Sequence, residues 1–454
     1  MGVSIQFLGA AGTVTGSKFL IKTDSTKLMV DCGMFQGLKP LRELNWAKLP
    51  VEPREIDAVF LTHGHLDHIG YLPRLVKFGF HGKVFTTKPT AKLAEIILED
   101  SGHIQEEEAA KANQKGYTKH KPALALYTST DVEYTIPLIE DIADNAWHEY
   151  NENIKFRFLR NGHIIGSSSI EIEIDGKRIV FSGDIGRFDD EMFLAPIQPK
   201  RADILILEST YGDRLHPKTQ TNVKIRDVIL DNHEKRGTLV IPSFTVDRAQ
   251  DIMYKIWVLK SNGEIPDIPV FLDSPMASAV SRLYHKYSEW NILGSHILKK
   301  VMESVQFIRA AKETEKLSKE EYSKIIIAGS GMMNGGRVLE YLKEELPKSN
   351  STVLITGFQA EGTRGRMLKE GAHEIKIEGK YYPVKAKIES IGTLSSHADQ
   401  HDILKWVGKL EKHPEKVFIV HGEPQAANAL RIKLKDIHEW KNIDIPQLFD
   451  EFDL

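Results

Sequence analysis

The sequence predicts a mixed α/β protein of two domains, and three observations lead to this prediction. The chain has 454 residues, which is more than one ordinary hydrophobic core organises. Short apolar runs bounded by Gly, Asp or Lys, which are typical of strands, dominate the first part of the chain. From about Gly212, apolar strands instead alternate with helical stretches, which is the pattern of a parallel sheet flanked by helices.

The first part of the chain is rich in predicted strands. We expect strands at 4–9, 17–23, 27–33, 56–62, 155–159, 169–174, 177–184 and 203–210. The dipeptide Asp175-Gly176 is a strong signal for a two-residue hairpin between two of these strands. Polar-apolar helical patterns begin at about Leu66 and extend from about Thr90 to Gln114.

The middle and the end of the chain continue with strands. The middle contains apolar runs at 237–244, 268–273, 324–331 and 351–358. A strand at 384–391, a helix at 402–410 and a strand at 416–422 follow. The middle therefore predicts a βαβ-type parallel sheet, inserted between two strand-rich parts.

Composition excludes several classes of protein. The sequence has neither a run apolar enough to span a bilayer nor the start of a secretory signal. Cys32 is the single cysteine, so no intramolecular disulfide forms, and we expect a small buried side chain in a reducing cytoplasm. The net charge of −3 excludes a global attraction for nucleic acid, so any acidic polymer would need a local basic groove.

The segment HGHLDH at 63–68 is the strongest chemical signal. His63 follows the predicted strand 56–62, and its i, i+2 spacing lets His63 and His65 point to one side of an extended loop. Asp67 and His68 can turn toward a second ion. Histidine nitrogens and carboxylate oxygens are ligands of zinc and similar metals, so this segment predicts a metal site.

Other candidate ligands follow predicted strands in the same way. His163 lies between two strands, Asp184 ends the strand 177–184 and His421 ends the strand 416–422. Each of these residues alone would more often make an ordinary loop hydrogen bond. The repeated pattern of apolar strand, then His or Asp, favours one metal centre closed from distant segments.

Together these motifs resemble a known family. HGHLDH, GH at 162–163, SGD at 182–184 and VHG at 420–422 resemble the metallo-β-lactamase-fold hydrolases. ESTYGD at 208–213 and GTLSSHAD at 392–399 narrow the resemblance to the β-CASP nucleases. The resemblance implies an αββα sandwich with an inserted β-CASP domain, divided into 1–212, 213–385 and 386–454.

The resemblance also implies roles for individual residues. One metal ion would be held by His63, His65 and His163, and the other by Asp67, His68 and His421, with Asp184 as a bridge. Asp31 would support the metal loop from behind. His397 would be the general acid and Glu208 would orient it, so the catalytic set is Asp67, Asp184, Glu208 and His397. Two zinc ions are expected, and manganese stays open.

Contacts with substrate are inferred from segments that resemble those facing the cleft of β-CASP enzymes. Arg248 in SFTVDRAQ and Arg364 in GFQAEGTRGR would bind backbone phosphates. Ser330 lies in the Gly-rich segment GSGMMNGGR, which an ordinary turn explains equally well. Ser395 matches a phosphate-binding serine of the RNase J branch, whereas Thr393 stands where that branch has a histidine.

The predicted function is that of a ribonuclease that hydrolyses phosphodiester bonds by two-metal hydroxide attack. Single-stranded RNA is the expected partner, a homodimer stays open, and no membrane is involved. We expect endonucleolytic cleavage, and the departure at Thr393 leaves 5′–3′ exonuclease activity open. The alternatives are a hydrolase of a small ester, a nuclease acting on DNA and a non-catalytic scaffold. His421 favours RNA, because DNA-directed relatives tend to carry valine there.

Overall fold

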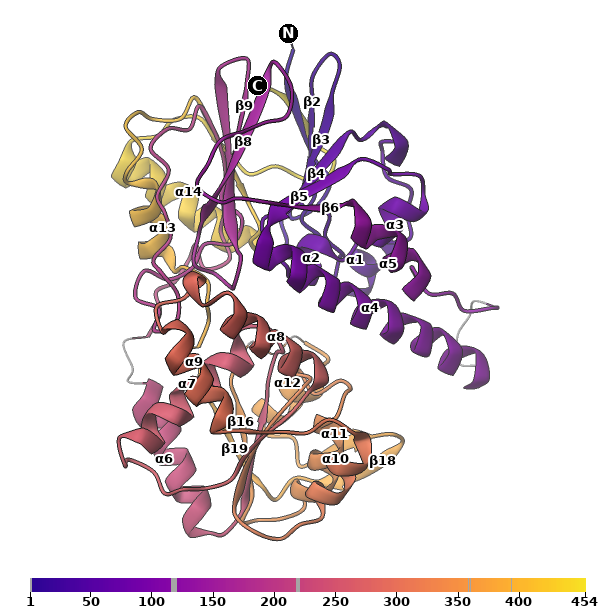
Figure 1. The fold of residues 1–454 in the computed structure, drawn as a ribbon, viewed down its shortest axis with the longest axis vertical. Coiled ribbons are helices and arrows are strands. Elements are labelled where there is room, and N and C mark those ends of the chain that lie inside the picture. The colour runs from indigo at the N-terminus through magenta and orange to yellow at the C-terminus, as the bar shows by residue number, and fades with distance from the viewer. Residues whose placement is uncertain (1, 116–120, 218–220, 358, 360, 393) are drawn as a thin grey trace. The chain divides into compact units, whose positions relative to one another are not determined.

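The computed structural model describes residues 2–115, 121–217, 221–357, 359, 361–392 and 394–454. The chain forms two compact units. The first contains Met1–Leu215 and His397–Leu454, and the second contains His216–Ser396 (Figure 1). Phe358 of the predicted strand 351–358, and Thr393, lie outside the described residues.

Two sheets form the centre of the first unit. The first sheet consists of β1 (Ser4–Phe7), β2 (Phe19–Lys22), β3 (Lys27–Val30), β4 (Ala58–Phe60), β5 (Lys83–Thr87), β6 (Ile139–Ile142) and β22 (Glu451–Asp453). Its order is β22-β1-β2-β3-β4-β5-β6. The second sheet consists of β7 (His148–Glu149), β8 (Ile154–Arg160), β9 (Ser168–Ile174), β10 (Lys177–Phe181), β11 (Ile204–Glu208), β20 (Lys416–Val420) and β21 (Ile443–Asp444). Its order is β21-β20-β11-β10-β9-β8-β7.

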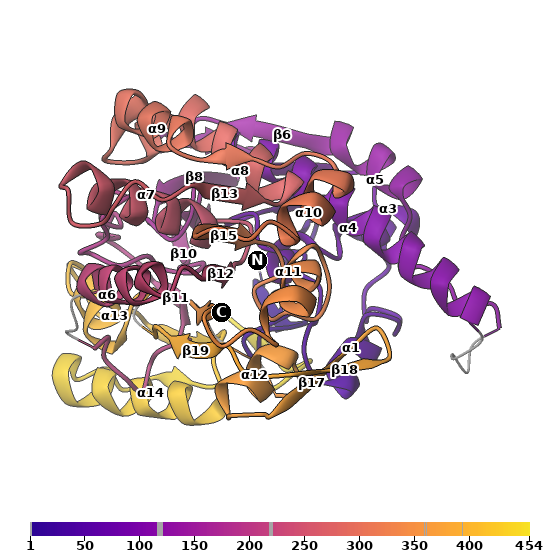
Figure 2. The ribbon, with the colours of Figure 1, turned by 90° about the horizontal axis from the view of Figure 1, so that it is seen from below.

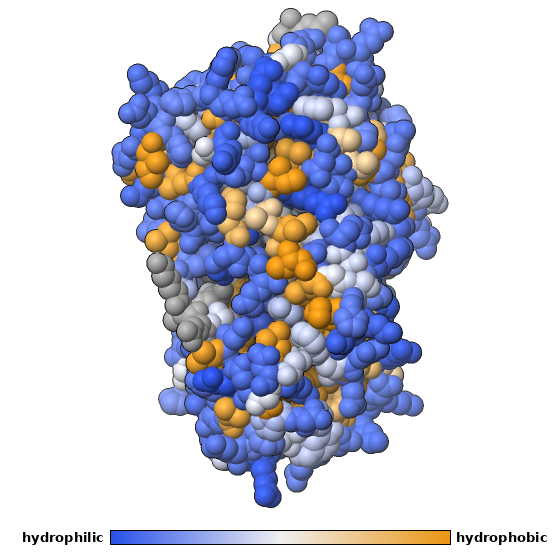
Figure 3. All heavy atoms as spheres, turned by 60° about the vertical axis from the view of Figure 1, so that its left-hand side comes forward, coloured by the Kyte–Doolittle hydropathy of each residue, from blue (hydrophilic) through white to orange (hydrophobic). Residues whose placement is uncertain are grey.

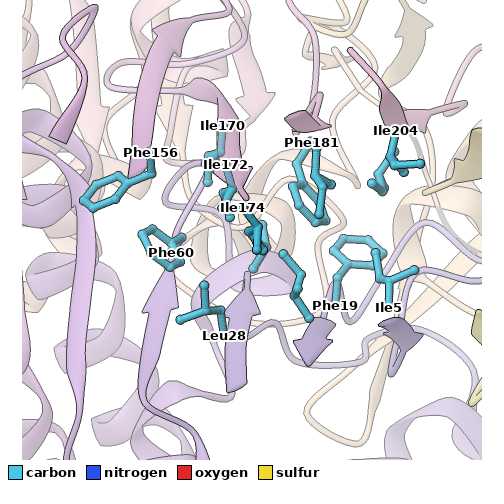
Figure 4. Packing of buried hydrophobic residues seen from close by; sticks show 14 of the residues in the cluster. Ile5, Phe19, Leu28, Phe60, Phe156, Ile170, Ile172, Ile174, Phe181 and Ile204 are labelled. Carbon is cyan, nitrogen blue, oxygen red and sulfur yellow. The ribbon is translucent and has the colours of Figure 1, made fainter. Parts of the chain in front are cut away.

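The main core of this unit lies between its two sheets. Alternate residues along each strand point to one face of a sheet, so each strand contributes every second side chain to this layer. Phe19 and Phe60 of the first sheet face Phe156 and Phe181 of the second sheet (Figure 4). The rings of Phe60 and Phe156 are 4.8 Å apart, centroid to centroid. The sheets on either side of this layer include β4, β10 and β20. The candidate ligands His63, Asp184 and His421 follow the ends of these strands.

Helices cover the outer faces of the two sheets. The described helices of the first unit are α1 (Lys39–Leu44), α2 (Leu66–Ile69), α3 (Leu72–Lys77), α4 (Lys88–Lys115), α5 (Ser129–Thr135), α13 (Gln400–Val407) and α14 (Pro424–His438), with short 3₁₀ turns at Pro53–Glu55 and Ile136–Leu138. Helix α4 packs against β5 and β6. Trp406 of α13 and Leu430 of α14 pack on Leu205 and Leu207 of β11. The first unit is therefore an αββα sandwich.

The second unit contains a mostly parallel sheet. It consists of β12 (Thr238–Pro242), β13 (Val270–Asp273), β14 (Gln306–Phe307), β15 (Lys324–Ala328), β16 (Thr352–Ile355) and β19 (Lys387–Ser390), in the order β14-β13-β15-β12-β16-β19. The described pairs within it are parallel. β17 (Glu374–Ile377) and β18 (Lys380–Pro383) form a separate hairpin.

Helices lie on both faces of this parallel sheet (Figure 2). They are α6 (Thr221–Glu234), α7 (Arg248–Ser261), α8 (Pro275–Lys286), α9 (Gly294–Glu303), α10 (Ala311–Ser318), α11 (Val338–Glu345) and α12 (Arg364–Lys369), with a 3₁₀ turn at Ser288–Trp290. Neighbouring residues of β15 point to opposite faces, with Ile325 packed toward α6 and α7 and Ile326 toward α11. This unit is the inserted parallel-sheet domain.

The structure differs from the sequence prediction at the second boundary. The compact units divide at 396/397, whereas the sequence places the boundary at 385/386. The reason is that β19 pairs in parallel with β16, through residues such as Ile388 and Val353, and so extends the inserted sheet. The predicted Asp175-Gly176 hairpin joins β9 and β10, and both residues have the positive φ that this turn requires.

One face of the described surface is largely polar. The face in Figure 3 is mainly hydrophilic, and its hydrophobic residues lie in small groups. Among the described helices, none has the length and the apolar character needed to cross a membrane. Cys32 is buried, as expected, and burial raises the pKa of its thiol to about 12.

Candidate metal and catalytic site

Main-chain hydrogen bonds hold the HGHLDH loop between β4 and α3. The N–H of Ser17 donates to the carbonyl of Asp67 at 2.8 Å, and the N–H of Cys32 donates to the carbonyl of His68 at 2.7 Å. Gly33 lies so close that a β-carbon there would be 1.6 Å from the Asp67 carbonyl oxygen. The loop is therefore fixed by backbone contacts, and His63, His65, Asp67 and His68 contribute side-chain atoms to the candidate ligand groups.

Three histidines and Asp184 form a first pocket. Nδ1 of His65 lies 3.1 Å from Nε2 of His63 and 3.3 Å from Nε2 of His163. Nε2 of His63 lies 3.5 Å from Oδ2 of Asp184. A tetrahedral zinc ion with bonds of about 2.0–2.1 Å places its nitrogen ligands about 3.3 Å apart, which matches these separations.

The protonation state of these histidines suits metal binding. Burial lowers the pKa of His63 and His163 well below the usual histidine value, and it lowers the pKa of His65 to about 4. All three rings are therefore neutral near pH 7. Neutral imidazoles offer a lone pair, which a metal ion requires of a histidine ligand.

Asp67, His68 and His421 form a second pocket. Nε2 of His421 lies 3.2 Å from Nε2 of His68 and 3.4 Å from Oδ2 of Asp67. Burial alone would lower the pKa of His68, but the carboxylates of Asp184 and Asp31 raise it well above the usual value. A proton and a metal ion would therefore compete for Nε2 of His68, and a cation of either kind belongs in this pocket.

Asp184 lies between the two pockets. Its Oδ2 faces His63 and His163, at 3.5 and 3.7 Å. Its Oδ1 lies 3.4 Å from Nε2 of His68 and 3.4 Å from Nδ1 of His421, and this buried oxygen has no hydrogen-bond partner among the described residues. One carboxylate with an oxygen toward each pocket is the arrangement expected of a bridging ligand. The donor set and the orphaned oxygen fit two transition-metal ions.

Asp31 lies behind the second pocket. Its Oδ2 is 2.7 Å from Nδ1 of His68, and its Oδ1 accepts a hydrogen bond from the N–H of Thr62 at 2.8 Å. An Nδ1–H bond to a carboxylate leaves Nε2 of His68 free to face a metal ion. This position agrees with the supporting role that the sequence resemblance implies.

His397 and Glu208 lie beside the pockets. Nδ1 of His397 is 3.6 Å from Oε1 of Glu208 and 4.0 Å from Oδ2 of Asp184. Glu208 is held in turn, because its Oε1 accepts from the N–H of Ile185 at 2.6 Å and its Oε2 from the N–H of Thr210 at 3.2 Å. The backbone of His397 pairs with Gly186 as an isolated β-bridge. The loop that carries Asp184 therefore also positions His397.

The carboxylates around His397 favour the protonated form of its ring. Burial alone would lower the pKa of His397, but Glu208, Asp184 and Asp67 outweigh burial and raise the pKa to about 9. The side chain of His397 keeps about a fifth of its surface exposed, at 21%. A charged and partly accessible imidazole can donate a proton to a bound molecule.

The predicted substrate contacts belong to the second unit and have mixed surroundings. Arg364 donates from Nε to the carbonyl of Lys376 at 2.7 Å and from Nη1 to the carbonyls of Met333 and Asn334. These bonds tie α12 to its neighbours, so three of the five N–H groups of Arg364 are already engaged. The side chain therefore supports the local backbone, and its phosphate contact stays a prediction.

Arg248 and the two serines also lie in the second unit. Arg248 is the first residue of α7 and is buried, with Nη1 3.9 Å from Oδ2 of Asp251. Its Nε and Nη1 are inaccessible and have no hydrogen-bond partner among the described residues. Ser330 and Ser395 are half-buried, and the carbonyl of Ser330 accepts from the N–H of Met333 at 3.1 Å. The predicted phosphate contacts of these residues stay predictions.

Two threonines that contact candidate ligands are not predicted by the sequence. Thr62 precedes His63 and lies 3.1 Å from its Nδ1, through Oγ1. Thr210, in ESTYGD, places Oγ1 3.1 Å from Nδ1 of His421. The only signal in the sequence is that each threonine lies next to a motif residue. A hydroxyl there has many ordinary uses, so sequence alone gives no reason to select either one.

Three family models match consecutive parts of the chain. Residues 11–223 match the metallo-β-lactamase superfamily, and residues 249–368 match the β-CASP domain. Residues 381–446 match a domain described as a Zn-dependent metallo-hydrolase RNA specificity domain.

Curated relatives and a solved structure agree with these models. The chain is 33% identical over 433 residues to ribonuclease TTHA0252 of Thermus thermophilus, which covers 93% of this chain and 94% of the relative. It is 31% identical over 449 residues to the RNase J-like protein of Methanocaldococcus jannaschii, covering 98% and 97%. A crystal structure of a protein of unknown function from Enterococcus faecalis V583 shares the fold, with a TM-score of 0.57, 12% identity and full coverage of both chains. From its matched domains and its identity to these full-length relatives, the chain belongs to the β-CASP group of the metallo-β-lactamase superfamily.

Proposed function

We propose that this protein hydrolyses phosphodiester bonds in single-stranded RNA and that it works with two zinc ions. The observation that carries the proposal is the position of Asp184, which has one carboxylate oxygen toward each pocket and His397 within 4.0 Å. His63, His65 and His163 would hold one ion, and Asp67, His68 and His421 the other, with Asp184 shared. Nitrogen and carboxylate ligands suit zinc, although manganese accepts similar ligands.

The residues of the site divide the chemistry between them. Two metal ions, when bound, would supply an acidified water and positive charge beside the phosphate. Hydrolysis forms a bond from a water oxygen to phosphorus and breaks the bond from phosphorus to the 3′-oxygen. The 3′-oxygen then needs a proton, which His397 would donate. Glu208 would keep the imidazole charged and oriented, so the products would have a 3′-hydroxyl and a 5′-phosphate.

Two further observations support RNA as the substrate. The C-terminal family model is described by its RNA specificity, and two of the relatives are named as a ribonuclease and as an RNase J-like protein. His421 occupies the position where DNA-directed relatives tend to carry valine, and here it contributes a nitrogen to the second pocket. An RNA substrate therefore fits both the relatives and the pocket.

The test compares matched nucleic acids. The purified protein is incubated with end-labelled single-stranded RNA and with DNA of the same sequence, and the product ends are mapped. We expect internal cleavage of RNA with 5′-phosphate ends, loss of activity with a chelator, and close to two zinc ions per chain by elemental analysis. Asp184→Asn should lose both metal and activity. The matched control is Asp189→Asn, because Asp189 is exposed and makes a surface ion pair with Arg187.

Other results would support the alternatives. Cleavage of DNA with intact RNA would make the protein a DNA nuclease. Inactivity on both polymers, with turnover of a small ester, would favour the small-ester hydrolase. A protein that binds no metal and cleaves nothing would be a scaffold. Single nucleotides released only from a 5′-phosphorylated end would replace endonuclease with 5′–3′ exonuclease activity.

A further inference from the structure

A threonine hydroxyl lies behind one histidine of each pocket. Thr62 is buried, and its Oγ1 is 3.1 Å from Nδ1 of His63. Thr210 is half-buried, and its Oγ1 is 3.1 Å from Nδ1 of His421. Nδ1 of His63 lies away from His65 and Asp184, which face Nε2. Nδ1 of His421 lies away from His68 and Asp67, which face Nε2, but it is also 3.4 Å from Oδ1 of Asp184.

The single hydrogen of the Thr62 hydroxyl is already committed. Oγ1 of Thr62 lies 2.9 and 3.0 Å from the two oxygens of Asp31, which is acceptor-only as a carboxylate. The hydroxyl therefore donates to Asp31 and offers only a lone pair to His63. Nδ1 of His63 must then carry the hydrogen, which leaves the lone pair of Nε2 toward His65 and Asp184.

The hydrogen-bond roles of the Thr210 hydroxyl are fixed in the same way. Its hydroxyl donates to the main-chain carbonyl of His421 at 3.1 Å, because a carbonyl can only accept. Its lone pair therefore faces Nδ1 of His421, whose other neighbour, Oδ1 of Asp184 at 3.4 Å, is also an acceptor. The hydrogen belongs on Nδ1, and Nε2 of His421 presents its lone pair to the second pocket.

We propose that Thr62 and Thr210 are positioning residues that each fix the tautomer of one metal-binding histidine, Thr62 for the His63 pocket and Thr210 for the His421 pocket. This inference rests on the proposed function only in that both pockets bind a metal ion. Thr62 also links Asp31 to His63. The carboxylate orients His68 directly, at 2.7 Å, and it orients His63 through the Thr62 hydroxyl. Partners of this kind contribute about 10- to 100-fold to metal affinity.

The test compares variants that lack the threonine hydroxyl with variants that keep it. Thr→Val at 62 or 210 preserves the shape and deletes the hydroxyl, whereas Thr→Ser keeps it. Each full-length protein is stripped and reloaded with Zn²⁺, and its affinity is measured by competition with a chromophoric chelator. We expect each valine variant to bind one of the two ions about 10- to 100-fold more weakly. Each serine variant should recover wild-type affinity. Thermal melts of the stripped proteins check folding, and Thr→Ala replaces any valine variant that does not fold.

A second background assigns each threonine to its pocket. His163→Ala removes one ligand of the first pocket, so the ion that remains tightly bound reports on the second pocket. In that background Thr210→Val should weaken the remaining ion more than Thr62→Val, because Thr62 acts on the second pocket only through Asp31 and at 3.4 Å from Nδ1 of His68. Valine variants with wild-type affinity would overturn the proposal, as would serine variants that are as weak as the valine variants. A wild-type protein that binds no metal would instead overturn the proposed function, and this inference with it.

Discussion

His397 shows at the scale of one residue how surroundings keep a common side chain protonated. A histidine in water is mostly neutral at pH 7, whereas the carboxylates around His397 raise its pKa to about 9 despite its burial. His397→Ala should therefore slow RNA cleavage by roughly 10²- to 10⁴-fold. Metal content should not change, because His397 belongs to none of the candidate ligand groups found among the described residues.

A matched histidine controls this experiment. His401 is exposed on α13, and His401→Ala should leave the cleavage rate unchanged. Rates are measured with saturating RNA, and metal is measured on the same samples. Loss of metal in His397→Ala would place His397 among the ligands, and an unchanged rate would remove it from the mechanism.

Lys18 is a buried charge next to the metal loop. Its Nζ donates to the carbonyls of Gly16 and Gly33, at 3.0 and 2.6 Å. Burial lowers the pKa of Lys18 to about 8, against 10.5 for an ordinary lysine. Below pH 8 the ammonium is charged in both the folded and the unfolded chain, so the folded protein bears the full cost of burying it. Between pH 8 and 10.5 the unfolded chain binds more protons, and the free energy of unfolding rises with pH.

Comparison with Lys18→Met isolates this effect. The wild type should gain about 3 kcal/mol of unfolding free energy relative to Lys18→Met as the pH rises from 7 to 10.5. Denaturant unfolding of both proteins at several pH values gives the difference, in which other titrating groups cancel. A difference that does not change with pH would mean that Lys18 keeps an ordinary pKa in the folded protein.

Sequence pattern carries more information about the candidate metal ligands than about the candidate substrate contacts, for a physical reason. His63, Asp184 and His421 each follow an apolar strand, and strand ends converge in a sandwich, so local pattern carries information about their shared site. Whether Arg364 faces a substrate depends on which carbonyls lie nearby. Those carbonyls come from Met333, Asn334 and Lys376, and no local pattern in the sequence reveals them.

At the scale of elements, the loops after strands carry the strain of the site. Ala10, Asp31 and His421 have φ angles of 52°, 56° and 48°, which residues other than glycine rarely adopt. Such conformations cost of order 1–3 kcal/mol each and persist only when their surroundings impose them. The N–H of His421 donates to the carbonyl of Ala10 at 2.7 Å. This hydrogen bond therefore links two residues with strained backbone conformations. These contacts fix the direction in which His421 leaves β20.

Gly33 is the tightest contact in the loop after β3. A β-carbon at residue 33 would lie 1.6 Å from the Asp67 carbonyl oxygen and 2.8 Å from the nitrogen of His68, so the metal loop would have to move. Gly33→Ala should lower the free energy of unfolding by about 1–3 kcal/mol or more and should weaken metal binding. Gly335→Ala is the control, because a β-carbon there meets no atom of the described residues within 4 Å. Wild-type metal affinity in Gly33→Ala would show that the loop adapts.

The predicted elements were most accurate where pattern and length agreed, and they failed where an element depends on distant pairing. The helix expected at 90–114 is α4, Lys88–Lys115. β22 has only Glu451–Asp453, and it exists because it pairs with β1 from the other end of the chain. β19 was expected as a strand, but its pairing with β16 decides that it belongs to the inserted unit. Pairing partners are tertiary information, so the sequence alone does not show that β19 joins the inserted sheet.

At the scale of the whole molecule, the candidate ligands come from both ends of an interrupted domain. His63 and Asp184 precede the inserted unit, and His421 follows it, yet all belong to the first compact unit. A metal ion that binds only the folded state stabilises that unit by RT ln(1 + [L]/Kd), which is about 2.7 kcal/mol at a free concentration of 100 Kd. The inserted unit contributes no candidate ligand among its described residues, so metal should not stabilise it directly.

Removal of metal should therefore affect the two units unequally. With roughly 2–4 °C per kcal/mol for domains of about 150–250 residues, a chelator should lower the melting temperature of the first unit by about 5–10 °C. Hydrogen exchange read by peptide mass spectrometry assigns the change. Peptides from β10, β11 and β20 should exchange faster without metal, and peptides from β12 and β15 should not change. In Asp184→Asn the chelator should have little effect, because that variant already lacks the shared ligand. Equal destabilisation of both units would mean that they unfold as one cooperative body, because a ligand bound to one unit then stabilises the other as well.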